Sequence, residues 1–102
     1  MSALVELSLF PLGEQGSLSP AVAKAVRIIR DSGLAYQLGP MGTCIEGDFH
    51  EVMAVVGRCF ETLRQDGHER IYLTIKADWR KGREGGLTSK TEAVATHLRS
   101  NT

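Results

Sequence analysis

Hydrophobic and polar residues alternate along residues 3–10, ALVELSLF. This period of two predicts a β-strand with one face in the protein core, while the other face is mixed. A second alternating segment, ERIYLTIKAD at residues 69–78, predicts another strand of this kind. The residues of that strand expected to face the core are Ile71, Leu73, Ile75 and Ala77.

The segment after the first strand has the spacing of an amphipathic helix, with Val22, Val26 and Ile29 on one face. Ser19 is a predicted N-cap because serine accepts hydrogen bonds from the first free amides of a helix. Pro20 suits the first helical position, and the helix is expected to stop at residues 32–33, Ser-Gly. This segment is the first predicted helix.

A second helix is predicted to follow Asp48, which is a suitable N-cap with Glu51 three residues later. Glycine suits the position after a helix C-terminus, so this helix is expected to end at residues 66–67, Asp-Gly. Its apolar residues recur at helical spacing more clearly than anywhere else in the chain. The predicted buried face consists of Phe49, Val52, Met53, Val56, Phe60 and Leu63.

Two short strands, LAYQLGP and GTCIEG, are predicted between the helices, joined by a tight Pro-Met-Gly turn. Beyond the last strand, WRKGREGGLT at residues 79–88 is polar and rich in glycine, which predicts a flexible loop. Ser89 with Glu92 then predicts a capped, short C-terminal helix carrying Val94 and Leu98.

The predicted order is strand, helix, strand, strand, helix, strand, the split βαβ pattern of a ferredoxin-like α+β sandwich. We therefore expect residues 1–102 to form one domain, with a four-stranded antiparallel sheet, two helices on one face and a short C-terminal helix. The open sheet face would carry a mixed set of side chains, which suits either oligomerisation or ligand binding. This set is Leu4, Glu6, Ser8, Phe10, Tyr72, Thr74 and Lys76, together with Cys44 and Glu46.

Charge narrows the classes of partner. Twelve basic and twelve acidic residues cancel and form no long run of one sign, so we expect no nucleic-acid partner and no anionic membrane partner. The apolar segments are shorter than the roughly 20 residues of a membrane span, and the N-terminus lacks a basic region, which predicts a cytoplasmic protein. Cys44 and Cys59 are expected to be free thiols, and the scattered histidines predict no metal site.

The stretch PMGTCIEGD, residues 40–48, is the best candidate for a binding site. Gly42 and Gly47 allow close approach of the backbone, Thr43 supplies a hydroxyl and Glu46 a carboxylate. The alternative is a plain turn in which Glu46 is a solvated charge near a helix N-terminus. Motifs of known catalytic sites are missing from the sequence, and Cys44 is better explained by packing than as a nucleophile.

Nearly the whole chain resembles the family of small thiamine-binding proteins related to the two-repeat protein YkoF. The most specific part is Tyr36 with residues 40–43, PMGT, and residues 45–47, IEG. Ser17 and Ser19 before the first helix, and residues 76–80, KADWR, support it. Trp79 departs from the family pattern, since many members have Asp or Arg at this position.

The resemblance implies a ferredoxin-like fold and non-catalytic binding of thiamine or its hydroxymethylpyrimidine part, without a cofactor. It also implies assembly into a homodimer or homotetramer. An aminopyrimidine and a thiazolium cation would suit a carboxylate, so Glu46 is the predicted polar anchor and Thr43 the second. The remaining predicted ligand-binding residues are Met41, Phe10 and Tyr36 as apolar walls, Ser8 and Ser19 as hydroxyl contacts, and Asp78 as a second carboxylate.

Loss of the Glu46 carboxylate would then weaken binding by about one to two orders of magnitude. Two other functions stay open. The chain could be a structural or regulatory oligomerisation module that uses its open sheet face, although Glu6, Ser8 and Thr74 are polar for a protein interface. It could also be a small enzyme acting on a pyrimidine or an amine.

Overall fold

The computed structural model describes residues 2–13, 16–82 and 86–100. Over these residues the chain forms a four-stranded antiparallel sheet in the order β2-β3-β1-β4, and the predicted ferredoxin-like α+β fold is confirmed. The elements are β1 (Ser2–Pro11), α1 (Ser19–Asp31), β2 (Ala35–Leu38), β3 (Thr43–Asp48), α2 (Phe49–Gln65), β4 (Ile71–Trp79) and α3 (Gly86–Ser100). Among the described helices, none is long and apolar enough to cross a membrane.

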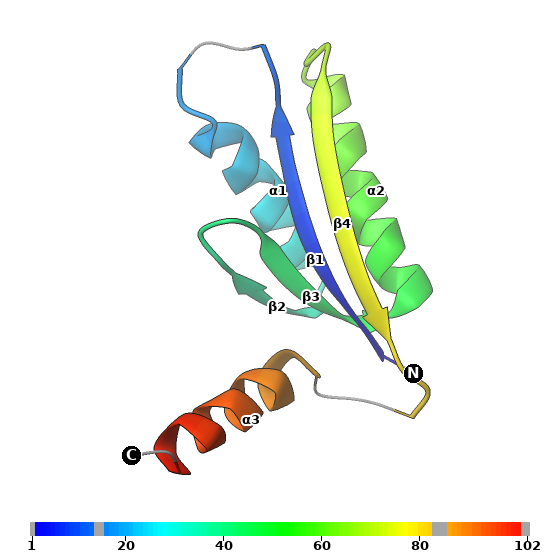
Figure 1. Cartoon of the computed structure of the whole chain (residues 1–102). Coiled ribbons are helices and arrows are strands. Elements are labelled where there is room, and N and C mark those ends of the chain that lie inside the picture. The colour runs from blue at the N-terminus through cyan, green and yellow to red at the C-terminus, as the bar shows by residue number, and fades with distance from the viewer. Residues whose placement is uncertain (1, 14–15, 83–85, 101–102) are drawn as a thin grey trace.

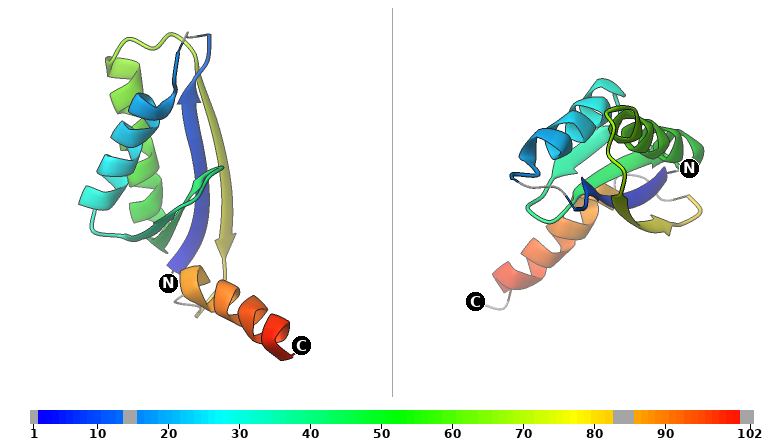
Figure 2. Two further views of the ribbon diagram at one scale, coloured as in Figure 1. Left: turned by 90° about the vertical axis from the view of Figure 1, so that its left-hand side faces the viewer. Right: turned by 90° about the horizontal axis from the view of Figure 1, so that it is seen from above.

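Helices α1 and α2 lie side by side on one face of the sheet, and the other face is open (Figures 1 and 2). Strand β1 runs through the middle of the sheet and supplies Ala3, Val5, Leu7 and Leu9 to the core, as its alternation predicts. Strand β3 pairs with β1 only as far as the partners Leu7 and Thr43, whereas β4 continues along β1 to Pro11. One edge of β1 is therefore left without a strand partner beyond Leu7.

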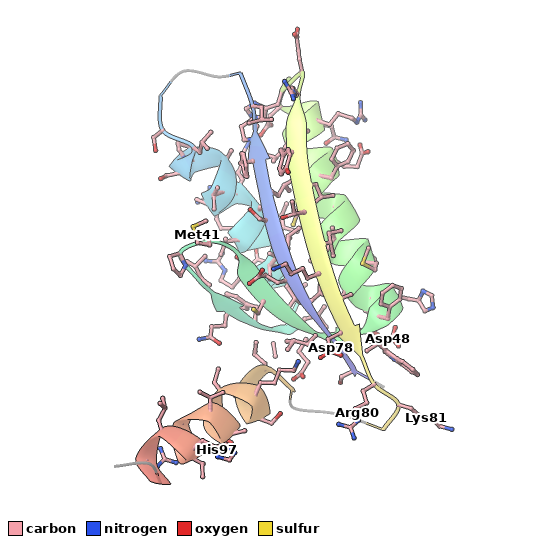
Figure 3. All side chains as sticks on the ribbon, viewed as in Figure 1. Met41, Asp48, Asp78, Arg80, Lys81 and His97 are labelled. Atoms are coloured by element: carbon pink, nitrogen blue, oxygen red, sulfur yellow. The ribbon has the colours of Figure 1, made fainter. Side chains whose placement is uncertain are left out.

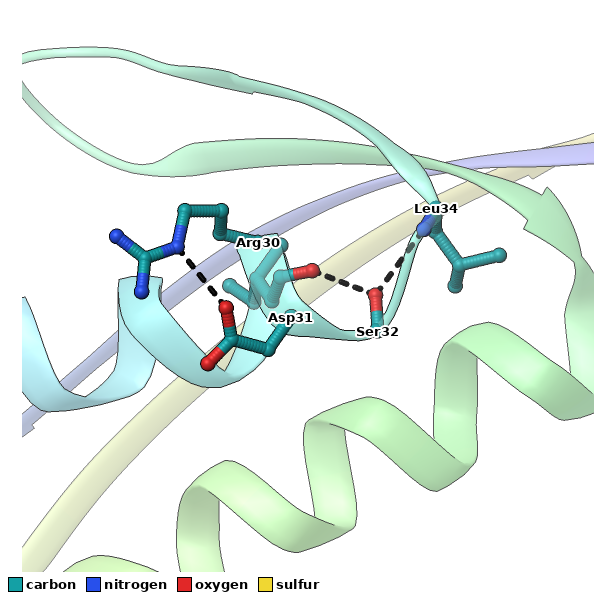
Figure 4. Close-up of polar contacts among 5 residues, drawn as sticks. Arg30, Asp31, Ser32 and Leu34 are labelled. Atoms are coloured by element: carbon teal, nitrogen blue, oxygen red, sulfur yellow. Dashed lines mark hydrogen bonds and ion pairs between the residues drawn. The ribbon is translucent and has the colours of Figure 1, made fainter.

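Helix α1 begins one residue earlier than predicted. Leu18, not Ser19, occupies the N-cap position, and no side chain caps the helix there. Instead, the Ser17 hydroxyl accepts a hydrogen bond from the Ser19 amide at 3.1 Å, so the upstream serine takes this role. At the other end, the Ser32 hydroxyl donates to the Ile29 carbonyl and accepts from the Leu34 amide, which leads the chain into β2 (Figure 4).

Helix α2 begins and ends as predicted. The Asp48 carboxylate accepts hydrogen bonds from the amides of His50 and Glu51, at 3.1 and 3.3 Å. The buried face of α2 differs from the prediction. It includes Val55 and Cys59, whereas Phe49, Met53 and Phe60 lie beside it and are not fully buried. The buried residues of the helix are Val52, Val55, Val56, Cys59 and Leu63.

Strand β4 is more exposed than predicted. Its register with β1 places Leu73, Ile75 and Ala77 on the helix side, but Leu73 and Ile75 keep 37 and 36 % of their surface in solvent. The reason is that β4 is an edge strand, and α2 packs mainly on β1 and β3. Of the four residues assigned to the core, Ile71 packs partly against it and the others do not belong to it.

Helix α3 begins at Gly86, so Ser89 lies inside the helix, and the prediction that Ser89 is its N-cap was wrong. The carboxylate of Glu46 on β3 accepts a hydrogen bond from the Leu87 amide at 3.2 Å, and Lys90 forms an ion pair with Asp78 on β4. The helix start is therefore set by a distant acidic residue. From this contact α3 extends away from the sheet (Figure 1). Residues 83–85 of the predicted loop lie outside the described residues.

Candidate functional site

A cavity of about 240 Å³ lies between α1, β1 and the turn that joins β2 to β3. It forms at the point where β3 stops pairing with β1, so the β2–β3 hairpin and α1 are left apart beside the free edge of β1. Its lining is mostly apolar. The residues are Leu7, Ser8, Leu9 and Phe10 of β1, Leu18, Val22, Ala25, Val26 and Ile29 from the α1 segment, and residues 38–43 of the hairpin.

The hairpin turn is tight because two glycines bring backbone atoms together. The Gly39 amide donates to the Gly42 carbonyl at 2.8 Å, and a Cβ atom at Gly39 would lie only 2.9 Å from that oxygen. At Gly42, a Cβ atom would lie 3.1 Å from the Leu7 carbonyl oxygen. Met41 lies in this turn (Figure 3), is 86 % exposed and lines the cavity.

The free edge of β1 presents a backbone donor and acceptor to the cavity. The Leu7 carbonyl points toward the hairpin, and the Leu12 amide points the opposite way, to the Arg70 carbonyl at 2.9 Å. Because backbone groups alternate between the two edges of an antiparallel strand, the N–H and C=O of Leu9 point toward the hairpin side. Among the described strands, none pairs with Leu9 on that side.

Thr43 is the buried polar residue of the cavity. Its exposed fraction is 5 %, and it begins β3 directly opposite Leu7. Its hydroxyl has no hydrogen-bond partner within the described part of the chain. A buried hydroxyl without a partner destabilises the folded state, so such a group is unusual unless it serves a ligand or water.

Among the described residues, none that lines the cavity is ionisable. The nearest thiols are both poor nucleophiles: burial and the neighbouring Glu6 carboxylate raise the pKa of Cys44, and burial raises the pKa of Cys59 to about 11. Cys59 donates a hydrogen bond to the Ala25 carbonyl at 3.5 Å. Over the described residues, no three side chains of the metal-ligating kind are grouped together.

The structure brings four of the eight predicted ligand-binding residues to this cavity: Thr43, Met41, Ser8 and Phe10. Ser8 and Phe10 alternate with core residues, so their side chains lie on the open sheet face and Phe10 stacks on Tyr72 there. Their side chains therefore lie on the sheet face opposite to α1.

The other four residues are elsewhere. Glu46 is on the open face of the sheet, where it binds the first turn of α3, and Asp78 binds Lys90. Tyr36 packs against the core, and Ser19 is the first residue of α1. The structure therefore does not bring the predicted carboxylate anchor to the cavity.

Sequence reasoning missed the backbone of Leu9 and the apolar wall from α1. The spacing of Val22, Val26 and Ile29 was a visible signal, but it indicated only a buried helix face. The sequence contained one signal for the free edge of β1. So few residues separate Pro40 from Asp48 that β3 is too short to pair with all of β1.

Fold and cavity together define a ferredoxin-like α+β protein with a small cavity whose described lining is uncharged. The chain belongs to the thiamine-binding protein family, whose model matches residues 5–95. A relative named UPF0045 protein, from Mycobacterium bovis, is 42 % identical over 99 residues, which is 96 % of each chain.

Solved structures agree with this assignment. A protein of Methanocaldococcus jannaschii superposes with a TM-score of 0.83 at 29 % identity, covering 92 % of this chain and 96 % of that chain. A Thermotoga maritima protein, provisionally named for thiamine biosynthesis or salvage, superposes with a TM-score of 0.78 at 26 % identity, covering 90 % of this chain and 99 % of its own.

Proposed function

We propose that this protein binds thiamine or its hydroxymethylpyrimidine part without catalysis, as a cytoplasmic carrier or sensor, and that the site is the cavity between α1 and the β2–β3 hairpin. The observation that carries the proposal is the buried hydroxyl of Thr43, which lines the cavity and has no partner among the described residues. Membership of the thiamine-binding family supports the ligand class.

The cavity suits a single flat ring. Its volume of about 240 Å³ lies below the roughly 300 to 1,000 Å³ of pockets for larger ligands. An aminopyrimidine carries a ring nitrogen that accepts a hydrogen bond next to an amino group that donates one. In our proposal these two groups pair with the N–H and C=O of Leu9, Thr43 binds a further polar atom, and Leu18 and Met41 cover the ring faces.

The thiazolium cation of thiamine does not fit the inside of this cavity. An unpaired charge in an apolar site loses its hydration without compensation, and the lining that the structure describes offers no carboxylate to replace the water. We therefore place only the neutral pyrimidine ring inside, with any thiazolium beyond the rim formed by Met41. This arrangement predicts that hydroxymethylpyrimidine alone retains most of the affinity.

Binding without catalysis is favoured by the state of Cys44. Burial and the Glu6 carboxylate raise the pKa of its thiol, which keeps it protonated and weakly nucleophilic at neutral pH. In addition, Cys44 alternates with Thr43 and Ile45, so its side chain lies on the sheet face away from the cavity.

Isothermal titration calorimetry with hydroxymethylpyrimidine and, separately, thiamine tests this proposal. We expect micromolar binding of both, within about fivefold of each other, because a thiazolium outside the cavity adds little. A pyrimidine with an oxo group in place of the amino group should bind at least about tenfold more weakly. Its donor and acceptor are exchanged, so it can pair with the N–H and C=O of Leu9 only with the ring turned over, which misplaces its other substituents. No heat with either ligand at high protein concentration would refute the proposed function.

We further propose that β4 mediates pairing between two copies of the chain. Its outer edge has no strand partner among the described residues over Ile71–Trp79, and Leu73, Ile75 and Tyr72 are partly exposed along it. Long exposed edge strands with apolar side chains favour pairing with another strand. A homodimer would use this edge alone, whereas a homotetramer would need a second surface such as the open sheet face.

A further inference from the structure

A second depression lies at the other end of the sheet, where β4 ends beside the start of α2. It has a volume of about 570 Å³ and is lined by Asp48, Phe49, His50 and Trp79. Figure 3 shows Asp48 next to the C-terminal end of β4. Trp79 pairs with Ala3 in β1, while the α1 cavity starts at Leu7, so the two sites are about 13 Å or more apart along the strand.

Two aromatic side chains form the apolar part of this depression. Trp79 is 52 % exposed and Phe49 is 37 % exposed, and Phe49 meets His50 edge-on with the ring centroids 5.5 Å apart. Within the described residues, the Trp79 indole makes no ring contact, and no lysine or arginine lies over its face. A face of tryptophan is the strongest aromatic partner for a cation, and no cation of the described residues occupies it here.

Asp48 supplies the charge. Both of its cap hydrogen bonds, from the His50 and Glu51 amides, go to the same oxygen, Oδ2. Among the described residues, nothing donates to the other oxygen, Oδ1. The positive end of α2 repels a cation with about half an elementary charge, but the Asp48 and Glu51 carboxylates together exceed it. The first turn of α2 is therefore negative on balance. Arg80 and Lys81 follow Trp79 in the chain, and Figure 3 shows them beyond the end of β4, away from Asp48.

We propose that this depression binds a small organic cation with methylated or delocalised charge, such as a quaternary ammonium group. Such a cation is weakly hydrated, so it gains from contact with the faces of Trp79 and Phe49 while its charge lies near Asp48. This site does not depend on the proposed function of the α1 cavity, because the two share no lining residue.

Trp79 is the only tryptophan of the chain, so its fluorescence reports directly on this depression. The test is a titration with choline at constant ionic strength, with excitation selective for tryptophan. The matched control is the uncharged carbon analogue of choline, in which a tert-butyl group replaces the trimethylammonium group. We expect a saturable fluorescence change with choline and none with the analogue.

Two variants separate the contributions. Asp48→Asn removes the charge but keeps the helix cap, because Asn caps as well as Asp, and should weaken choline binding at least about threefold. Phe49→Leu removes one aromatic wall and keeps the reporter, and should also weaken binding at least about threefold. Circular dichroism of both variants checks that α2 is intact.

The inference is overturned if choline gives no saturable change, or if choline and its uncharged analogue give the same response. Equal choline binding by the wild type and Asp48→Asn would also overturn it, since the charge would then have no role. A saturable response that is specific for the cation and weakened by both variants would establish the site.

Discussion

The replacement of Thr43 by valine is expected to raise the stability of the unliganded protein and to weaken ligand binding. Valine has nearly the shape of threonine but no hydroxyl. Because Thr43 is 5 % exposed and its hydroxyl has no partner in the described chain, removal of the hydroxyl should relieve an unsatisfied polar group in the unliganded protein. The same hydroxyl is a proposed ligand contact, so its removal should weaken binding.

The size of each effect follows from the site. A buried hydroxyl without a partner costs about 1 to 3 kcal/mol, and we take the lower end because the cavity can admit water. Thr43→Val should therefore raise the free energy of unfolding by about 1 kcal/mol, which is a rise in Tm of roughly 4 to 8 °C for a domain of this size. Loss of one ligand hydrogen bond should weaken binding of hydroxymethylpyrimidine roughly 5- to 10-fold.

Urea unfolding of the unliganded variant and calorimetric titration of its ligand measure the two effects. Thr43→Ser keeps the hydroxyl and should bind within about threefold of the wild type. Thr74→Val, on exposed β4 opposite Ser8, measures the preference of a strand for valine alone. A Thr43→Val protein that is less stable than the wild type and binds ligand equally well would refute the reasoning, because the hydroxyl would then be a structural group.

Three further predictions concern groups outside the cavity. Glu46→Gln should weaken the 3.2 Å hydrogen bond from the Leu87 amide and so increase hydrogen exchange of that amide. The affinity for hydroxymethylpyrimidine should change less than about twofold; a tenfold loss would show that Glu46 contributes to the binding site. Burial raises the pKa of Cys59 to about 11, so as the pH rises the thiol ionises in the unfolded state before it does in the folded state. Between about pH 9 and 11, the free energy of unfolding of the wild type should therefore fall by about 2 to 3 kcal/mol more than that of Cys59→Ala, as measured by urea unfolding. Ile75→Lys should convert a β4-paired dimer to monomer in light scattering, and an unchanged mass would exclude pairing through this edge.

Much of the fold was predictable because its signals are local. The alternation at residues 3–10, the Asp48 cap and the glycine at 67 each act over a few residues, and the structure has β1, the start of α2 and its end where they indicate. Two of the errors arose where a distant residue decides. The start of α3 is set by Glu46, about 40 residues earlier in the chain, and the exposure of Leu73 and Ile75 depends on which strands the helices cover.

The candidate site was predictable only in part, for the same reason. The hairpin sequence predicted Thr43 and Met41 as site residues, because glycines beside a hydroxyl are a local feature, and both line the candidate cavity. Glu46 follows Thr43 by only three residues, but the alternation of β3 sends the two side chains to opposite faces of the sheet. The backbone of Leu9 could not be identified from its side chain, since only the end of β3 frees its N–H and C=O.

The short length of β3 accounts for both the space and the specificity of the proposed site. Because β3 stops opposite Leu7, a gap opens beside β1, and the same stop leaves the Leu9 N–H and C=O without strand partners. A neutral ring that lacks a matching donor and acceptor would fill the gap but leave these groups unpaired, and such mismatches reject ligands far more strongly than a missing apolar contact does. In the proposed site, a cavity whose described lining is uncharged would therefore select one heterocycle without a carboxylate anchor. In this view the charge of thiamine contributes solubility outside the cavity, and its pyrimidine ring contributes the recognition.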